Sequence, residues 1–373
     1  MGADVVFTLS LETFDDVVRR EFCRPPDRGL LALAQSPEVT RLAVVDAWRS
    51  WPSAVIRRRG LSSTEQVEVA DRLVTRLRPR RLRRGEPTEV RVLEREYARY
   101  SRWSGRVLGL RSGDEAALVT YNPFVAAFAD APWIGRRVFV CRDDFASAPR
   151  KKPWWPAYRR AYEQLADRCD AVFAVSDELA SRIAPGLART LPNGIDAQLW
   201  SPERVVERPE VPYAVYAGTV ERRVDLTLLA EVLKVVPRIL VAGVIADEEM
   251  RRELQEMAGV EVLGPLKQED LVRVVSGGSV GLIPHHDTPM TRAMSPLKMY
   301  EYLAAGLPVV ATDLPPVADG GDRVWRCTTR GEWAGAVRAA LAAGVHGPAE
   351  RAEVIAQISW DARLAPVVEA AVS

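Results

Sequence analysis

Long apolar runs are absent from this sequence, and no stretch is long enough to cross a bilayer as a helix. Cysteine is scarce: Cys23, Cys141, Cys169 and Cys327 form neither a C-x-x-C pair nor metal-ligand spacing with a histidine. The amino terminus lacks the basic start, apolar core and cleavage site of a leader, and residues 5–7 begin a strand pattern instead. These absences predict a protein of the reducing cytoplasm with no metal site.

An excess of one charge is also missing, because the formal net charge is only +1. A molecule with so small a net charge has no global field that attracts nucleic acid. The first predicted strand is not followed by G-x-G-x-x-G, which disfavours a dinucleotide-dependent dehydrogenase. Any anionic partner must therefore be recognised by local groups of residues.

What the sequence does contain is a regular alternation of short Val-, Ile- and Ala-rich runs with longer segments of helical period. This pattern predicts an α/β fold with parallel sheets covered by helices, and 373 residues suffice for two domains. The strands are expected at residues 5–9, 39–45, 116–120, 138–141 and 171–175, and then at 213–217, 239–243, 260–263, 280–284 and 308–311.

A polar stretch with Pro202, Pro209 and Pro212 separates the two halves and predicts a domain boundary. We expect a first domain over residues 1–200 and a second over 201–357.

The segment 295–312, S-P-L-K-M-Y-E-Y-L-A-A-G-L-P-V-V-A-T, carries the strongest chemical signal. Ser295 and Pro296 predict a capped helix start, and Gly306 predicts its end. The positive end of a helix dipole beside Lys298 favours a diphosphate, and Glu301 on the same face can accept the two hydroxyls of a ribose.

This segment resembles the donor-site signature of bacterial GT-B glycosyltransferases, of the group 1 or family 4 type. Three further segments resemble that family: residues 216–226, Y-A-G-T-V-E-R-R-V-D-L; residues 191–196, L-P-N-G-I-D; and residues 166–176. The resemblance implies two Rossmann-like domains with parallel sheets facing across a cleft, the first binding the acceptor and the second the donor. The sequence I-S-W-D at residues 358–361 resembles the start of the family's final helix, which implies a last helix over about 358–373 that returns to the first domain. It also implies metal-independent transfer of a sugar from a nucleoside diphosphate sugar to a hydroxyl acceptor, with no further cofactor.

By this resemblance, Glu301 binds the ribose, Lys298 and Ser295 bind the diphosphate, and Arg222 or Arg223 reaches the phosphates from across the pocket. The remaining donor-side positions that match the family are Gly218, Thr219, Pro296 and Leu297. Many retaining members carry a second glutamate eight residues before the ribose-binding one. This chain has Ala293 there, so the stereochemical course stays open.

An inverting reaction needs a base that takes the acceptor proton, and Asp143 and Asp144 follow a predicted strand at its carboxyl end. Either is a candidate, and a solvated loop pair is the alternative. Glu12 and Asn122 also follow predicted strands and are candidates on the acceptor side. Glu12 is equally well explained as an acid at a helix start.

His285 and His286 end the predicted strand 280–284 and are candidates for contacts with phosphate or sugar oxygens. Thr291 and Arg292 lie just before the signature helix and are weaker candidates for the same role. An ordinary loop explains all four as well.

Two basic groups lie in the first domain: the arginines between Arg72 and Arg84, and residues 150–160, R-K-K-P-W-W-P-A-Y-R-R. They predict peripheral contact with an acidic membrane at the inner face of the cell and a lipid-linked acceptor, although solvated arginines explain them too. No nucleic-acid motif accompanies the charge.

The sequence therefore predicts a glycosyltransferase of polysaccharide, lipid-linked or natural-product glycoside biosynthesis. A nucleotide-sugar epimerase and an inactive nucleotide- or carbohydrate-binding protein stay open as alternatives.

Overall fold

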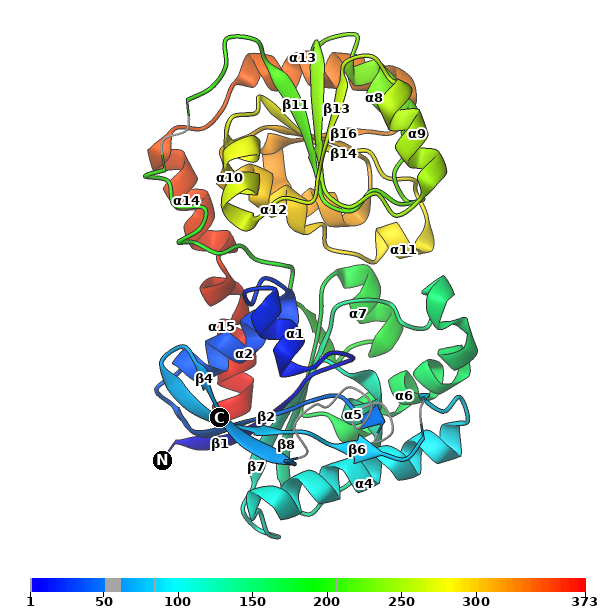
Figure 1. Cartoon of the computed structure of the whole chain (residues 1–373), viewed down its shortest axis with the longest axis vertical. Helices are drawn as coiled ribbons and strands as arrows, with labels where there is room; N and C mark the ends of the chain where they lie inside the picture. Colours follow the sequence, from blue (N-terminus) through cyan, green and yellow to red (C-terminus); the bar gives the residue numbers. More distant parts are fainter. Residues whose placement is uncertain (1, 51–61, 84, 205–206) are drawn as a thin grey trace. The chain divides into compact units, whose positions relative to one another are not determined.

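The chain folds into two compact units, each built around its own sheet (Figure 1). The computed structural model describes residues 2–50, 62–83, 85–204 and 207–373. The first unit comprises Met1–Pro192 and Leu364–Ser373, and the second comprises Asn193–Arg363. The boundary was expected after residue 200, but the second unit begins at Asn193, so the segment 193–200 belongs to the second unit.

The first sheet has the strand order β10-β9-β8-β7-β1-β2-β5-β4, and all neighbours are parallel except β4 and β5. Its central strands read as apolar runs because helices cover both faces. The strands are β1 (Ala3–Thr8), β2 (Val39–Val45), β4 (Thr64–Val69), β5 (Arg72–Leu77), β7 (Ala116–Thr120), β8 (Ile134–Cys141), β9 (Ala171–Ala174) and β10 (Ala188–Thr190). Two short strands, β3 (Arg49–Ser50) and β6 (Arg80–Arg81), pair separately.

One face of this sheet packs on α4, α5 and α6, where Val6, Ala43 and Leu118 meet Tyr97, Phe124 and Tyr158 in one apolar cluster. Alternate strand residues point to opposite faces, so Val5, Phe7 and Val44 are buried on the other side. The helices are α1 (Phe14–Arg19), α2 (Pro25–Gln35), α4 (Val90–Leu108), α5 (Pro123–Phe128), η1 (Pro149–Trp154), α6 (Trp155–Arg168) and α7 (Asp177–Ile183).

The second sheet is wholly parallel, with the order β13-β12-β11-β14-β15-β16. Val215 and Ala217 of β11 point into one apolar cluster and Ala214 and Tyr216 into another, so helices cover both faces of this sheet as well. The strands are β11 (Tyr213–Ala217), β12 (Arg238–Ala242), β13 (Val260–Gly264), β14 (Val280–Ile283), β15 (Val309–Thr312) and β16 (Val324–Cys327).

The helices of the second unit include α12, which lies in the same cluster as Val215 and carries the signature segment. They are α8 (Thr227–Val232), α9 (Glu248–Glu256), α10 (Gln268–Ser276), α11 (Pro289–Arg292), α12 (Leu297–Ala304), η2 (Pro315–Arg323), η3 (Arg330–Glu332), α13 (Trp333–Ala343) and α14 (Pro348–Ile358).

The last helix, α15 (Trp360–Val372), begins in the second unit, and its residues from Leu364 onward belong to the first. Within the first unit, the Arg136 guanidinium of β8 donates to the Ser373 hydroxyl at 2.5 Å and to the Ala370 carbonyl at 3.4 Å. The end of the chain is thereby fixed to the first sheet.

The α/β class with parallel sheets, predicted from the apolar alternation, is confirmed. All ten predicted strands are present, with ends that shift by a few residues at most. Sequence reasoning missed β4, β10, β16 and the short pair β3 and β6, and it treated the start of the arginine-rich segment as a surface group although Arg72–Leu77 is strand β5. Among the described residues, no helix is both long and apolar enough to cross a membrane.

Candidate functional site

Two strand ends of the second unit meet at a pair of glycines. The Gly218 amide donates to the Ala242 carbonyl at 2.7 Å, and a Cβ on Gly243 would lie 2.1 Å from the Gly218 oxygen. Both residues have positive φ, +117° and +150°, which favours glycine over residues with a side chain. This close approach leaves the end of β11 without a side chain, at the carboxyl edge where α/β sheets bind ligands.

Lys298 of α12 lies directly over this glycine turn. A Cβ on Gly218 would be 3.4 Å from its Cε and 3.5 Å from its Nζ. The ammonium is 3.7 Å from the centre of the Tyr216 ring, a cation–π contact, yet its Nζ is buried with no hydrogen-bond partner among the described residues. Burial, and then the nearby Arg223, lower the pKa of Lys298 well below its usual value. A buried cation without an acceptor is costly, so this position favours a bound anion.

His285 lies beside the same turn and is equally unusual. It is 1% exposed, and both of its ring nitrogens lack a hydrogen-bond partner among the described residues. Burial, Lys298 and Arg223 lower the pKa of His285 well below its usual value. The imidazole is therefore neutral, with one N–H available as a donor.

Arg223 supplies the third group. Its Nη1 is 3.2 Å from Glu221, and its buried Nε has no hydrogen-bond partner within the described part of the chain. An antiparallel bridge between Val224 and His285 and the hydrogen bond from the His286 amide to the Arg223 carbonyl, 2.8 Å, hold this segment against the end of β14. We call Lys298, Arg223 and the neutral hydrogen-bond donor His285 the cation cluster.

Glu301 follows Lys298 by three residues on α12 and is half-buried. Burial raises the pKa of Glu301 to about 7, while Lys298 acts in the opposite direction. An ionised carboxylate at this position would gain from hydroxyl donors such as those of a ribose.

Two tyrosines of α12 fix the helix against the sheet. The Tyr302 hydroxyl accepts the Ala217 amide at 2.7 Å, next to the glycine turn, and lies 3.4 Å from the Leu282 carbonyl of β14. The Tyr300 hydroxyl donates to Asp319 at 2.8 Å. These bonds hold Lys298 and Glu301 in a fixed relation to β11, and they rest on residues that sequence reasoning did not single out.

The predicted capping role of Ser295 is wrong. The helix begins at Leu297 with Pro296 at the N-cap position and has no side-chain cap. The Ser295 hydroxyl instead accepts the Asn193 amide at 3.0 Å and lies 3.2 Å from the Tyr300 hydroxyl. The Asn193 side chain also donates to the Ser295 carbonyl at 2.6 Å. Ser295 thus fixes Asn193 next to α12. Its hydroxyl accepts the Asn193 backbone amide and does not cap the helix.

The other donor-side candidates are less involved. Arg222 is 85% exposed at its side chain and pairs with Asp247 at 3.3 Å, so the structure brings Arg223, and not Arg222, to Lys298. Thr219 is exposed, and its carbonyl accepts the Tyr216 hydroxyl at 2.9 Å. Leu297 is half-buried on the first turn of α12.

Around the end of β14, the weaker candidates have local structural partners. His286 is half exposed, with its Nδ1 3.7 Å from Asp225. Thr291 is fully buried, completes the capping box of α11 with Thr288 and donates to the His286 carbonyl at 2.6 Å. Arg292 pairs with Asp287 at 2.6 Å, and Ala293 is buried just beyond α11.

In the first unit, Asp143 and Asp144 follow β8 as predicted but differ in their surroundings. The Asp144 carboxylate is 9% exposed, pairs with Arg182 at 3.1 Å and accepts the Ala146 amide at 3.1 Å. Asp143 is exposed. Asp144 therefore fixes the loop, and Asp143 is the more exposed of the two acids.

Glu12 and Asn122 have well-defined structural partners. Glu12 pairs with Arg20 at 2.7 Å and with Arg24 at 2.5 Å. The Asn122 side chain caps α5 by accepting the Phe124 amide at 2.9 Å and donates to the Ser10 carbonyl at 3.0 Å. These contacts satisfy both side chains within the first unit.

The arginines between Arg72 and Arg83 do not form the open basic surface that the sequence suggested. Arg72 donates to the carbonyls of Ala34, Ser36, Val39 and Thr40, and Arg76 is 2% exposed with three acidic partners. Arg78 pairs with Glu65, and Arg81 pairs with Glu86 and Glu96. Acids and carbonyls thus pair with these four arginines, two of which lie in strand β5. Arg83 is exposed, and Arg84 lies outside the described residues.

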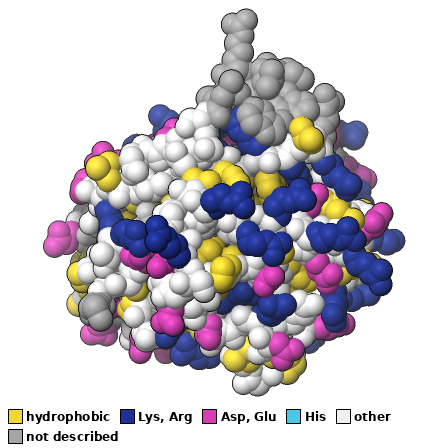
Figure 2. Space-filling model, turned by 90° about the horizontal axis from the view of Figure 1, so that it is seen from below, with side chains coloured by type: hydrophobic (Ala, Val, Ile, Leu, Met, Phe, Trp, Pro, Cys, Tyr) yellow, Lys and Arg dark blue, Asp and Glu magenta, His cyan; other side chains and the backbone are white. Residues whose placement is uncertain are grey.

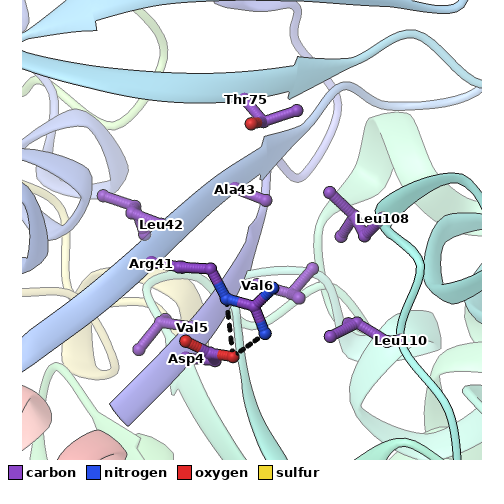
Figure 3. A pocket seen from close by; sticks show the side chains of 9 residues that line it. All are labelled: Asp4, Val5, Val6, Arg41, Leu42, Ala43, Thr75, Leu108 and Leu110. Carbon is purple, nitrogen blue, oxygen red and sulfur yellow. Dashed lines mark hydrogen bonds and ion pairs between the residues drawn. The ribbon is translucent and has the colours of Figure 1, made fainter. Parts of the chain in front are cut away.

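A small hollow in the first unit lies beside β1, β2, β5 and the end of α4 (Figure 3). Its charged side chains, Asp4 and Arg41, pair with each other, with Arg41 Nε 2.8 Å from the carboxylate. None of the predicted site residues lines it, so it is not a candidate for the site. In the described part of the chain, no group of three His, Cys, Asp or Glu side chains is placed to hold a metal ion.

Comparison with solved structures identifies the fold class as GT-B. α,α-Trehalose-6-phosphate synthase from Burkholderia multivorans has a TM-score of 0.68 and 12% identity, covering 99% of this chain and 98% of that one. Sucrose-phosphate synthase from Thermosynechococcus elongatus has a TM-score of 0.63 and 14% identity, and Anabaena HepE in complex with UDP-glucose has 0.58 and 12%; each covers 98% of both chains. The predicted resemblance is therefore confirmed at the level of the fold.

The sequence comparisons narrow the class further. Residues 212–343 match the family of glycosyl transferases group 1, and this range contains the glycine turn, the cation cluster and α12. The putative teichuronic acid biosynthesis glycosyltransferase TuaH of Bacillus subtilis (strain 168) is 26% identical over 168 residues, 41% of this chain. The match spans 42% of that relative, less than half of its length. The recognition of a group 1 glycosyltransferase domain in the second unit is confirmed.

Proposed function

We propose that this protein is a glycosyltransferase that moves a sugar from a nucleoside diphosphate sugar to a hydroxyl acceptor. The observation that carries the proposal is the cation cluster. Its buried nitrogens have no acceptor among the described residues, and Lys298 lies at the glycine turn of the matched group 1 range, with His285 and Arg223 near it. A diphosphate supplies several anionic oxygens that can accept from these nitrogens, and charge-assisted hydrogen bonds to it are strong.

In the proposed reaction, the bond between the anomeric carbon and the diphosphate oxygen breaks, and a bond from the acceptor oxygen to that carbon forms. The diphosphate leaves as an anion, and the cation cluster stabilises the charge that develops on it. The acceptor proton passes to a base. Glu301 accepts hydroxyls of the nucleotide ribose and so places the diphosphate over Gly218.

For the base, we propose Asp143, with Asp144 fixing its loop through Arg182. Separate Asp143→Asn and Asp144→Asn variants test this role. Asp143→Asn should lower kcat by at least about a hundredfold while leaving nucleoside diphosphate affinity unchanged. Full activity of Asp143→Asn would remove it as the base.

The finer assignments are also proposals. The name of the TuaH relative supports a role in polysaccharide biosynthesis, and the UDP-glucose bound to HepE supports a uridine diphosphate sugar as donor. We further propose that the protein works in the cytoplasm, without a metal, at the inner face of the membrane, with a lipid-linked acceptor.

The test combines calorimetry with product analysis. Nucleoside diphosphates of different bases are titrated into the protein, and the tightest binder selects the sugar donors. Mass spectrometry of reactions with lipid-linked and free sugar acceptors then identifies a product. Binding of no nucleoside diphosphate would contradict the donor site, and binding without any transfer would support the inactive alternative.

A further inference from the structure

The first unit carries a row of arginines that the sequence analysis did not single out. Within Val90–Leu108, all of which the structure describes, every exposed position is an arginine: Arg91, Arg95, Arg99, Arg102 and Arg106. Their spacing of four, four, three and four residues places them along one ridge of α4. At 1.5 Å per residue, the row is about 22 Å long.

The helix that carries this row is firmly packed. Its opposite face buries Leu93, Tyr97 and Tyr100 in the core of the first unit. The Trp133 indole donates to the Ser101 carbonyl at 2.9 Å, and a Cβ on Gly105 would lie 2.2 Å from the Trp133 ring. The arginines are therefore displayed from a fixed helix, not from a loop.

Four of these five arginines form no ion pair within the described part of the chain. Arg102 lies 3.5 Å from Asp130, but Arg91, Arg95, Arg99 and Arg106 pair with no acidic side chain among the described residues. By contrast, α9 in the second unit exposes Glu248, Glu249, Glu253 and Glu256 beside Arg252. The arginine row is thus a specific property of α4 and not of exposed helices in this chain generally.

The basic surface is wider than the helix ridge. Figure 2 views the molecule from below, the side on which α4 lies in Figure 1, and Lys and Arg side chains spread across much of that face. Next to the start of α4, the Trp154 indole donates to the Pro87 carbonyl at 2.9 Å, which fixes η1 there with exposed Arg150 and Lys152. Half-buried Trp154 and Trp155 lie in the same segment.

We propose that the α4 face, defined by the five arginines of α4 with Arg150 and Lys152, binds the surface of an anionic lipid bilayer. A broad basic face fits a plane of phosphate headgroups, and nearby tryptophans favour the membrane interface. A nucleic-acid duplex would need only a narrow row, and its stacked bases would not reach the indoles. The inference deepens the proposed membrane contact by naming its surface, and it does not depend on the donor chemistry.

The test is co-sedimentation of the full chain with vesicles of phosphatidylcholine alone or mixed with phosphatidylglycerol. The variant Arg95→Glu/Arg99→Glu should bind the anionic vesicles at least about twentyfold more weakly, because each basic residue near such a surface contributes about fivefold. The matched control Arg252→Glu/Arg338→Glu changes the net charge equally, on exposed helix positions of the second unit, and should bind like the parent protein.

An equal loss of vesicle binding in both variants would mean that only the net charge matters, and it would overturn the assignment. Binding of the parent protein to neutral vesicles as strongly as to anionic ones would overturn it as well. A double-stranded DNA fragment that prevents vesicle binding at equal phosphate concentration would identify a nucleic-acid partner instead. Nucleoside diphosphate calorimetry of the Arg95→Glu/Arg99→Glu variant should be unchanged. That readout separates a failure of this proposal from a failure of the donor site.

Discussion

Two regions of this molecule bury charged groups at the ends of parallel strands, and they treat those charges in opposite ways. In the first unit, Arg76 of β5 directs all three guanidinium nitrogens to acids: Nε and Nη2 to Asp46, Nη1 to Glu65, and both Nη atoms to Asp15. In the second unit, the nitrogens of the cation cluster have no acceptor within the part of the chain that the structure describes.

We propose that this difference separates a charge that stabilises the fold from charges that bind a ligand. A buried ion pair with complete hydrogen bonding is consistent with a purely structural role, and removing one partner leaves the other uncompensated. A buried cation without an acceptor destabilises the fold and is retained where a ligand supplies the missing partner. The predictions below test this distinction from the largest expected effect to the smallest.

The largest effect is expected at Arg76. Arg76→Met leaves Asp46 buried without its cation and should lower the free energy of unfolding by about 3–5 kcal/mol. Urea denaturation measures this loss. Nucleoside diphosphate affinity, measured at a temperature where the variant is folded, should not change; a loss of affinity would mean that the first-unit network also serves the donor.

Lys298→Met should have the reverse outcome. It removes a charge-assisted contact to the diphosphate and should weaken nucleoside diphosphate binding by about a hundredfold. Because a methionine needs no buried acceptor, the melting temperature should stay the same or rise. A lower melting temperature with unchanged affinity would make Lys298 a structural residue.

The pH dependence of donor binding should follow Glu301. Because its pKa is raised to about 7, the carboxylate is protonated below that pH and must release a proton before it accepts ribose hydroxyls. Affinity should therefore fall as the pH drops below about 7, by up to tenfold per unit. The control is calorimetry of the Glu301→Gln variant. This variant should bind the nucleoside diphosphate about tenfold more weakly than the parent protein at pH 8. Its affinity should no longer show the fall below pH 7 that protonation of Glu301 causes.

Arg222 and Arg223 provide a matched pair with the smallest expected effects. Arg223→Ala should weaken nucleoside diphosphate binding by about tenfold, since its Nε belongs to the cation cluster. Arg222→Ala should change it by less than about twofold, since that side chain is exposed. Equal effects of the two substitutions on nucleoside diphosphate affinity would contradict the assignment of Arg223, and not Arg222, to the diphosphate.

Much of this could be predicted from the sequence, for identifiable reasons. The parallel sheets could be predicted because their strands are short, continuous apolar runs, the pattern of strands covered on both faces. The position of α12 could be predicted from its apolar period and from Gly306, which has a φ of +83° just beyond the helix. Lys298 and Glu301 were found because a sequence signature fixes their spacing.

What escaped prediction depends on contacts between distant segments. Nothing near Ser295 in the sequence reveals that Asn193, about a hundred residues earlier, takes its hydroxyl. The choice of Arg223 over Arg222 and the burial of His285 depend on how a loop crosses the end of β14. The arginines of β5 seemed to form a surface because their acidic partners lie elsewhere in the chain.

The most direct measurement is a crystal structure of the protein with a bound nucleoside diphosphate. We expect diphosphate oxygens within hydrogen-bond distance of Lys298 Nζ, His285 and Arg223, over Gly218, with the ribose hydroxyls on Glu301. A nucleotide bound elsewhere, with the three nitrogen groups still lacking partners, would contradict it.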